Sequence, residues 1–223
     1  MYTTLLFDVD DTLLDFKKTE KFAIRKTLES YGISVTEQII ADYGKINEKL
    51  WEMYQRGEIT KNRLVVKRFE ELGEKYGISF DASDANNRYL ENNANGFFEI
   101  PGAKDTLKNL KKRFKVYAVT NALLWVSERR LKGSGLYPLF EKVFNSDQIG
   151  ASKPNKEFFD VVFNNIEEKD KSKILIIGDS LSSDILGGIN AGIDTCWVNP
   201  EGKSTDLKIT MEIKSVTELE KRL

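Results

Sequence analysis

The chain opens on a short apolar run that ends in clustered carboxylates. Residues 5–7, LLF, are typical of a buried strand; Asp8, Asp10 and Asp11 follow, and apolar residues return at positions 13 and 14. Carboxylates that lie close together repel one another and are costly to remove from water. Side chains two apart on an extended chain point the same way, so we expect the carboxylates of Asp8 and Asp10 to converge on one point. A divalent cation there would offset their charge, and a solvated Asp-rich turn after an edge strand is the alternative.

Residues 16–97 have a helical pattern with no proline and no strand-like segment. Glycines and capping residues divide this stretch into four predicted helices. The helices are expected at residues 18–31, 37–54, 60–76 and 81–95. We therefore predict a helical bundle domain over residues 16–97, inserted after the first strand and hinged at its two chain connections.

After Pro101-Gly102 the pattern alternates between apolar strands and amphipathic helices. Strands are predicted at residues 115–120, 142–144, 173–178 and 194–198, with a weak one near residue 209. Helices are predicted at residues 103–113, 125–132, 156–165, 182–191 and 215–222. Strands that alternate with helices form a parallel sheet that is covered on both faces. The sequence thus predicts an α/β, Rossmann-like core over residues 1–15 and 98–223.

Functional residues of such a sheet lie beyond the carboxyl ends of its strands. Thr120 ends one predicted strand, and Asn121 follows it. A hydroxyl and backbone N–H groups are therefore available there to hold the oxygens of an anion. The alternative is a plain Thr-Asn turn. Lys153 precedes a predicted helix, and Pro154 fixes the backbone beside it. Taken alone, a lysine in that position is usually solvated.

The most apolar predicted strand, residues 173–178, is followed by two further carboxylates. Asp179 comes directly after the strand, and Asp184 lies on the first turn of the next predicted helix. We expect Asp179 to lie on the same rim as Asp8. The alternative is that Asp179 or Ser180 only caps the helix.

The composition of the 223 residues excludes several kinds of function. The chain has no histidine, which rules out His-activated nucleophiles and His-ligated metals. A bound metal would therefore be held by oxygen, and Mg²⁺ is favoured. The net charge of -1 argues against nucleic acid or an anionic membrane as partner. The single cysteine, Cys196, permits no intrachain disulfide and is expected to be buried and inert. The lack of disulfides and of a signal-like segment favours the cytoplasm.

Four motifs in this order resemble the haloacid dehalogenase (HAD) superfamily, most of whose members are phosphatases. They are DVDDT at residues 8–12, Thr120-Asn121, Lys153 in SKPNKEFF, and GDSLSSD at residues 178–184. The resemblance covers the whole chain, with the helical insertion in the place of a C1-type cap. The dehalogenase branch lacks a carboxylate two residues after its nucleophile, and the transport ATPase branch has threonine there. Asp10 therefore favours the phosphatases and phosphomutases.

The resemblance implies roles for individual residues. Asp8 would attack phosphorus to form an aspartyl-phosphate, and Asp10 would protonate the leaving oxygen and then activate water. Mg²⁺ would be held by the carboxylates of Asp8 and Asp179 and by the backbone carbonyl of Asp10, and Asp184 would support these ligands without binding the ion. An aspartate near its ordinary pKa of about 3.9 is ionised at neutral pH, as this attack requires.

The same resemblance implies how the phosphoryl group is held. Thr120 and the backbone of Asn121 would bind its oxygens. Lys153 would offset the negative charge around the nucleophile and the phosphoryl group, which otherwise repel one another. The set is intact, which makes a catalytically idle binding protein a poor alternative.

Two segments favour a particular substrate class. LWEMYQRGEIT at residues 50–60 and SDILGGINAGIDTCWVN at residues 183–199 resemble a subgroup of 5'-nucleotidases that act on pyrimidine nucleotides. This implies hydrolysis of a nucleoside 5'-monophosphate; a sugar-phosphate phosphatase or a phosphomutase is the alternative. The expected partner is a small phosphorylated substrate, with no nucleic acid or membrane, and the protein is expected to be a monomer or weak homodimer. The aromatic candidates to stack on a base, or else to pack between the domains, are Phe16, Tyr43, Trp51 and Tyr54.

Overall fold

The computed structural model describes all residues, 1–223, and they form two compact units. The core unit consists of Met1–Phe16 and Phe97–Leu223, and the helical unit is Lys17–Gly96. The boundaries expected from the sequence, after residues 15 and 97, differ from these by one residue each.

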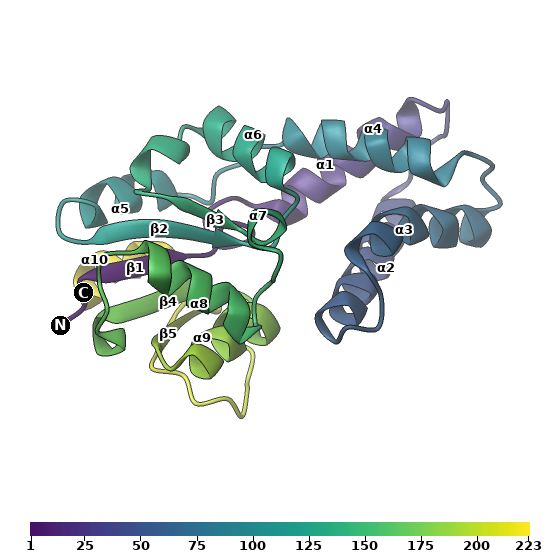
Figure 1. The fold of residues 1–223 in the computed structure, drawn as a ribbon. Helices are drawn as coiled ribbons and strands as arrows, with labels where there is room; N and C mark the ends of the chain where they lie inside the picture. Colours follow the sequence, from purple (N-terminus) through teal and green to yellow (C-terminus); the bar gives the residue numbers. More distant parts are fainter. The chain divides into compact units, whose positions relative to one another are not determined.

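The core unit contains a six-stranded parallel sheet with the order β3-β2-β1-β4-β5-β6 (Figure 1). The strands are β1 Thr4–Phe7, β2 Lys115–Thr120, β3 Val143–Asn145, β4 Ile174–Gly178, β5 Asp194–Val198 and β6 Met211–Ile213. The predicted α/β class is confirmed, although the weak strand expected near residue 209 begins at Met211. Because β1 pairs with both β2 and β4, the first strand is central, and the edge-strand alternative is wrong.

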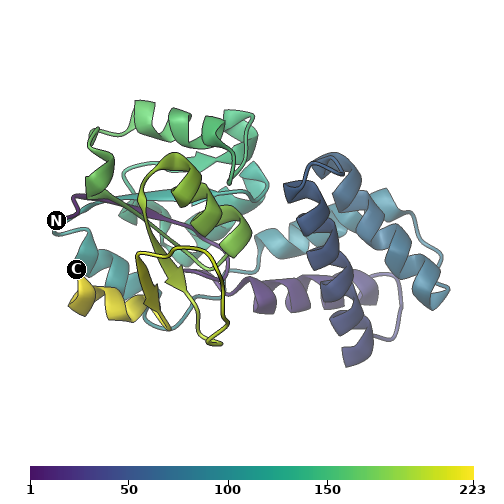
Figure 2. The same cartoon turned by 90° about the horizontal axis from the view of Figure 1, so that it is seen from below.

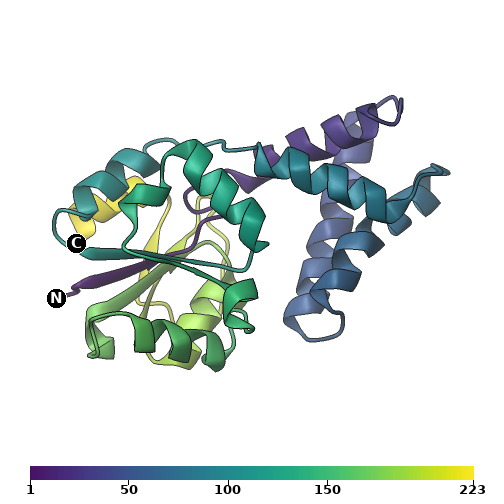
Figure 3. The same ribbon diagram turned by 45° about the horizontal axis from the view of Figure 1, so that its top comes forward.

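Helices cover both faces of this sheet (Figure 3). They are α5 Ala103–Leu110, α6 Leu124–Ser134, α7 Ser146–Ile149, α8 Lys156–Asn165, α9 Leu186–Ala191 and α10 Leu219–Arg222. Leu5 and Phe7 of β1 pack with α5, α6 and α10 on one face, whereas Leu6 packs with α8 and α9 on the other. This alternation is what a strand buried on both faces requires. The short α7 was not predicted, and Figure 2 shows both termini at the end of the sheet where β1 begins.

The helical unit is built from four helices. They are α1 Phe16–Glu29, which starts in the core unit, α2 Glu37–Gln55, α3 Lys61–Tyr76 and α4 Ala82–Ala94. Their ends follow local chemistry: the Thr60 hydroxyl accepts a hydrogen bond from Arg63 N, and Gly77 closes α3 with φ of 63°. Tyr43 is fully buried in the core of this unit, so it packs there and is not available to stack on a base. Every helix of the protein is too short or too polar to span a lipid bilayer.

The two chain connections between the units run side by side within each unit. In the core unit, Asp15 N donates to Phe98 O at 2.8 Å and Ile100 N donates to Leu13 O at 3.0 Å. In the helical unit, the Thr19 hydroxyl donates to Gly96 O at 2.9 Å. The helical unit is therefore attached by two short, hydrogen-bonded segments and by no long linker.

Candidate active site

The turn after β1 sets the direction of the first two carboxylates. Asp8 N still donates to Ile177 O of β4 at 2.9 Å, but Leu13 N and Leu14 N both donate to Val9 O at 2.9 Å, so the extended chain ends at Val9. Asp11 then adopts a φ of 57°, a conformation that aspartate tolerates better than most residues. Asp10 is not among the carboxylates that the fold gathers around Asp8, although its charge still acts on Asp8 and contributes to the raised pKa of that group.

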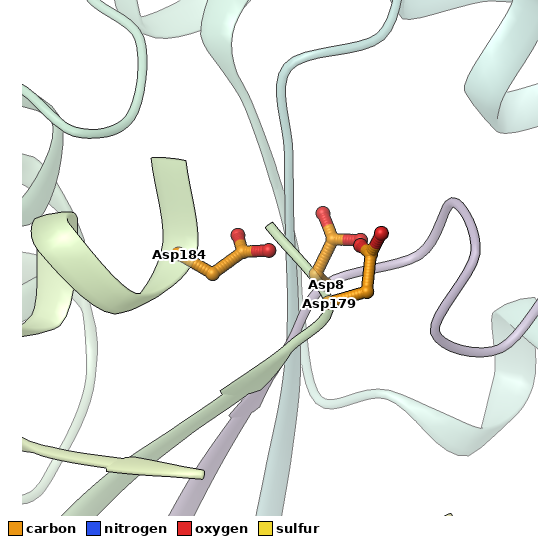
Figure 4. A group of neighbouring side chains, drawn as sticks. All are labelled: Asp8, Asp179 and Asp184. Atoms are coloured by element: carbon orange, nitrogen blue, oxygen red, sulfur yellow. The ribbon is translucent and has the colours of Figure 1, made fainter. Parts of the chain in front are cut away.

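The carboxylate of Asp8 instead meets two others (Figure 4). One oxygen from each of Asp8, Asp179 and Asp184 lies within 4.8 Å of the others. Asp8 and Asp179 come from the carboxyl ends of β1 and β4, which are neighbours in the sheet. Asp184 points toward them from the turn that follows β4. Residues far apart in the sequence thus form one acidic cluster at the rim of the sheet.

Lys153 is the cation of this cluster. Its Nζ donates hydrogen bonds to Asp8 Oδ1 at 2.7 Å, to Asp184 Oδ1 at 2.6 Å and to Val119 O at 2.8 Å. The ammonium group has three N–H donors, and these bonds use all of them. Because the side chain is only 1% exposed, the alternative of a solvated lysine is wrong.

The side chain of Asn121 fixes the backbone of Lys153. Asn121 Nδ2 donates to Lys153 O at 2.9 Å, and Lys153 N donates to Asn121 Oδ1 at 3.0 Å. Sequence reasoning assigned a role to the Asn121 backbone and missed this one. The only available signal was an amide side chain directly after a strand, which is not specific.

Thr120 lies on the same rim, because β2 pairs with β1. Its buried hydroxyl accepts a hydrogen bond from Ala122 N at 3.1 Å. A hydroxyl that accepts one hydrogen bond keeps its own proton for another acceptor. Thr120 therefore keeps a proton that it can donate to an anion at this rim.

The charges of the cluster shift its pKa values. Burial, and then the charge of Asp184, raise the pKa of Asp8 to about 8, although Lys153 opposes the shift. Burial, with Asp8 and Asp184 next, raises the pKa of Asp179 well above its usual range. Burial alone would lower the pKa of Lys153, but Asp184 and Asp8 outweigh it and raise it. The pKa of Asp8 therefore lies above the value near 3.9 expected from the sequence, because burial disfavours its charged form and Asp184 adds to the shift.

These residues fit a hard divalent cation. The cluster offers only oxygen donors, which suit Mg²⁺ and Ca²⁺ better than Zn²⁺. Burial, together with the neighbouring carboxylates, raises the pKa values of Asp8 and Asp179, and a bound cation would favour their charged forms. Both oxygens of Asp184 already accept hydrogen bonds, from Lys153 Nζ and from Ser180 N at 3.1 Å. Asp8 and Asp179 are therefore better placed than Asp184 to ligate an ion.

The segment after Asp179 departs from the predicted helix. Leu181–Ile185 forms a π-helical turn before α9, and Ser180, not Asp179, is its N-cap. Such turns occur frequently at functional sites. A further contact that the sequence did not reveal is the indole of Trp197, which donates to Asp179 O at 2.8 Å. The Asp179 backbone is thereby fixed from β5, and its side chain is left for the cluster.

Gly178 leaves the space that Asp184 occupies. A Cβ at position 178 would lie 2.2 Å from Asp184 Oδ2, far inside contact distance. We expect Gly178→Ala to displace Asp184, to lower the free energy of unfolding by about 1–3 kcal/mol and to weaken cation binding. Urea unfolding and a cation titration check this, with Ile177→Val as control, because it removes one methylene from the same strand and leaves Asp184 untouched. Unchanged cation affinity would contradict the role given to Asp184.

Arg130 is a charged residue that sequence reasoning missed. It lies on α6, its side chain is 1% exposed, and its Nη1 forms an ion pair with Asp10 Oδ1. In the sequence it stands beside Arg129 in a charged helix, where a solvated position is the ordinary expectation. Asp10 is thus paired with its own cation and is not one of the three clustered carboxylates.

The chain matches known proteins along most of its length. A model of the haloacid dehalogenase-like hydrolase family matches residues 2–192. The chain is 41% identical over 220 residues to YfnB of Bacillus subtilis, named as a HAD-hydrolase, with 98% of this chain and 94% of YfnB covered. The crystal structure of YfnB bound to magnesium, described as revealing interdomain movement, has a TM-score of 0.96 and covers 100% of this chain and 98% of that one.

Two further relatives carry names of activities. The pyrimidine 5'-nucleotidase PynA of Streptococcus pneumoniae is 38% identical over 221 residues, with 98% of this chain and 93% of PynA covered. The pyrimidine 5'-nucleotidase YjjG of Escherichia coli is 32% identical over 225 residues, with 98% of this chain and 96% of YjjG covered.

Proposed function

The chain belongs to the haloacid dehalogenase-like hydrolases and is a phosphatase of that superfamily, and we propose that it is a magnesium-dependent nucleoside 5'-monophosphate phosphatase. The observation that carries the proposal is the buried nucleophile candidate Asp8, held between Lys153 and a cation site. The names of PynA and YjjG support a pyrimidine nucleotide as substrate. From the composition we also propose that the protein is cytoplasmic and binds neither nucleic acid nor membrane. We further propose that it is a monomer or weak homodimer.

In the first step, the Asp8 carboxylate attacks phosphorus while the bond from phosphorus to the leaving oxygen breaks. Asp10 donates its proton to that oxygen, so that the nucleoside leaves as a neutral alcohol. Thr120 and the Asn121 backbone hold the phosphoryl oxygens, and Lys153 offsets the negative charge around them. The product of this step is an aspartyl-phosphate on Asp8.

In the second step, Asp10 accepts a proton from water, and the water oxygen attacks phosphorus. The bond from phosphorus to Asp8 breaks, which releases inorganic phosphate and restores both carboxyl groups to their starting states. Mg²⁺, held by Asp8, Asp179 and the Asp10 carbonyl, would supply positive charge that keeps Asp8 ionised and favours its approach to an anion. This charge would act against burial and Asp184, which raise the pKa of Asp8.

A panel assay tests the proposal. Phosphate release is measured from pyrimidine and purine 5'-monophosphates and from sugar phosphates, with magnesium and with a chelator. We expect magnesium-dependent release, fastest from pyrimidine nucleotides. Faster release from a sugar phosphate would contradict the substrate, and phosphoryl transfer between sugar positions without free phosphate would indicate a phosphomutase.

Cation binding should also be visible without turnover. Magnesium at about 100 times its dissociation constant is expected to stabilise the wild type by about 2.7 kcal/mol. Asp179→Asn removes one of the two carboxylates best placed to ligate the ion and should abolish most of this gain. Thermal unfolding with and without magnesium measures both values. An equal gain in the variant would place the cation elsewhere.

We propose that the helical unit acts as the cap that selects the leaving group. Trp51 and Tyr54 are partly exposed on α2, with their rings 5.6 Å apart in an edge-to-face arrangement. Replacing Trp51 with alanine should change the ratio of kcat/KM between nucleotides more than the activity on p-nitrophenyl phosphate, which is too small to need many cap contacts. A parallel loss of both activities with a lower Tm would show that the ring only packs.

A further inference from the structure

Arg130 is an arginine buried in the core unit. Arginine is almost never fully buried unless it is paired, because removing its charge from water is costly. Here the side chain is 1% exposed, whereas the neighbouring Arg129 is exposed. An arginine in such a place needs a specific partner, and that partner is Asp10.

The guanidinium group of Arg130 is held from several sides. Nη1 pairs with Asp10 Oδ1, and the centre of the guanidinium lies 5.7 Å from the ring centroid of Phe16. Helix α6, which carries Arg130, is itself fixed, because Asn145 Nδ2 donates to the Ser127 hydroxyl at 3.0 Å. Arg130 thus presents a rigid donor to one oxygen of Asp10.

Asp10 needs such a partner because of its place in the chain. It lies in the tight turn after β1, where the following residue has a φ of 57°, and not within a strand that would orient its side chain. The Asp10 side chain is 27% exposed, so the carboxylate is fixed from the protein side and still open on the other. A proton donor displaced by about 1 Å can lose about 10²-fold in rate, so this hold bears on catalysis.

We propose that Arg130 is a positioning residue that holds the Asp10 carboxylate in the orientation needed for both proton transfers. Asp10 Oδ1 accepts from the guanidinium throughout, and Oδ2 carries the proton that passes to the leaving oxygen and later takes one from the attacking water. The inference rests on the proposed phosphatase mechanism, but it does not depend on the nucleotide substrate. It assigns to α6 a part in the chemistry that the four motifs do not include.

The test compares substrates that differ in their need for a proton. Phenyl phosphate has a poor leaving group, whereas p-nitrophenolate leaves readily without protonation. Arg130→Met should lower kcat on phenyl phosphate about 10²-fold with little change in KM. On p-nitrophenyl phosphate, the first step should stay fast and the second should slow, which gives a burst of about one p-nitrophenolate per enzyme. Arg130→Lys keeps the charge and should recover part of kcat, and Arg129→Met is the matched control, expected at wild-type activity.

A double-mutant cycle separates positioning from a merely structural role. If Arg130 acts through Asp10, then Arg130→Met added to Asp10→Asn should cost less than about threefold more, because the group it positions no longer transfers protons. Losses that multiply, or an Arg130→Met protein with normal leaving-group dependence and no burst, would overturn the proposal. If Arg130→Met does not fold, the same measurements are made on Arg130→Lys and on the Arg130→Lys/Asp10→Asn double variant.

The outcomes also separate this inference from the proposed function. Wild-type activity on the two aryl phosphates with none on nucleotides would refute the nucleotide substrate and leave this test intact. No phosphate release from any ester would refute the phosphatase mechanism and the role of Arg130 together.

Discussion

Asp8→Asn is expected to reduce kcat about 10⁶-fold, the size of the loss when a covalent nucleophile is removed. An amide has nearly the shape of the carboxylate but does not attack phosphorus, so no aspartyl-phosphate forms. Phosphate release and acid-quenched labelling of the enzyme with phosphate measure the loss. The preparation must be checked by mass spectrometry, because deamidation of the introduced asparagine would restore the wild type.

The same variant should be more stable than the wild type when both are free of metal. The pKa of Asp8 is raised from 3.8 to about 8 in the folded protein, so folding takes up a proton over this range. The stability that Asp8 contributes is therefore complete below about pH 4 and is lost as the pH rises toward 8. The introduced amide carries no such charge, so the advantage of the variant over the wild type should grow from pH 5 to pH 8.

Thermal unfolding in chelator at several pH values measures this difference. Asp160→Asn is a suitable control, because that carboxylate is exposed and pairs with Lys156 on the surface of α8. A constant difference between Asp8→Asn and the wild type across the pH range would show that Asp8 is ionised without a cation. Substantial turnover by the Asp8→Asn variant would refute the covalent mechanism.

Local chemistry made most of the fold predictable from the sequence. The ends of α3 and α4 follow from Thr60, Gly77 and Asp81, whose capping depends on neighbours within a few residues. The parallel sheet follows from apolar strands that alternate with helices, and the order of strands then brings Asp8 and Asp179 to one rim. These features need no knowledge of long-range packing.

The contacts that hold the site were not predictable, because they join distant residues through ordinary side-chain types. Arg130 and Asp10 are 120 residues apart, Asn121 and Lys153 are 32 apart, and Trp197 and Asp179 are 18 apart. An arginine on a helix or a tryptophan in a strand has many possible partners. Only the packed structure selects one of them.

The segment after β4 shows a second limit. The pattern of residues 182–191 predicts one regular helix, whereas the structure has a π-helical turn over Leu181–Ile185. Apolar spacing does not distinguish these, since both bury the same face. The turn places the Asp184 carboxylate against Gly178, a contact that depends on the missing Cβ at that position.

Lys153→Met should have the largest effect on stability. Methionine fills a similar volume but leaves the carboxylates of Asp8 and Asp184 buried without their cation, and breaking a buried pair in this way costs about 3–5 kcal/mol. The loss should be greatest near pH 8 without metal and smaller near pH 5, where the raised pKa of Asp8 allows it to be protonated. Magnesium should restore part of the stability by replacing the missing positive charge.

Activity should fall with it, because the positive charge beside Asp8 is removed. We expect a loss in kcat of about 10²–10³-fold even when the variant is saturated with magnesium. Lys156→Met is the matched control: it removes an exposed lysine three positions along, whose ion pair with Asp160 should be worth less than about 1 kcal/mol. Urea unfolding of both variants and of the Lys153→Met/Asp184→Asn double variant completes the measurement. The double variant should regain part of the lost stability, because it removes one of the carboxylates that Lys153 compensates. If Lys153→Met unfolds no more readily than Lys156→Met, then Lys153 is not the buried counter-charge of the cluster.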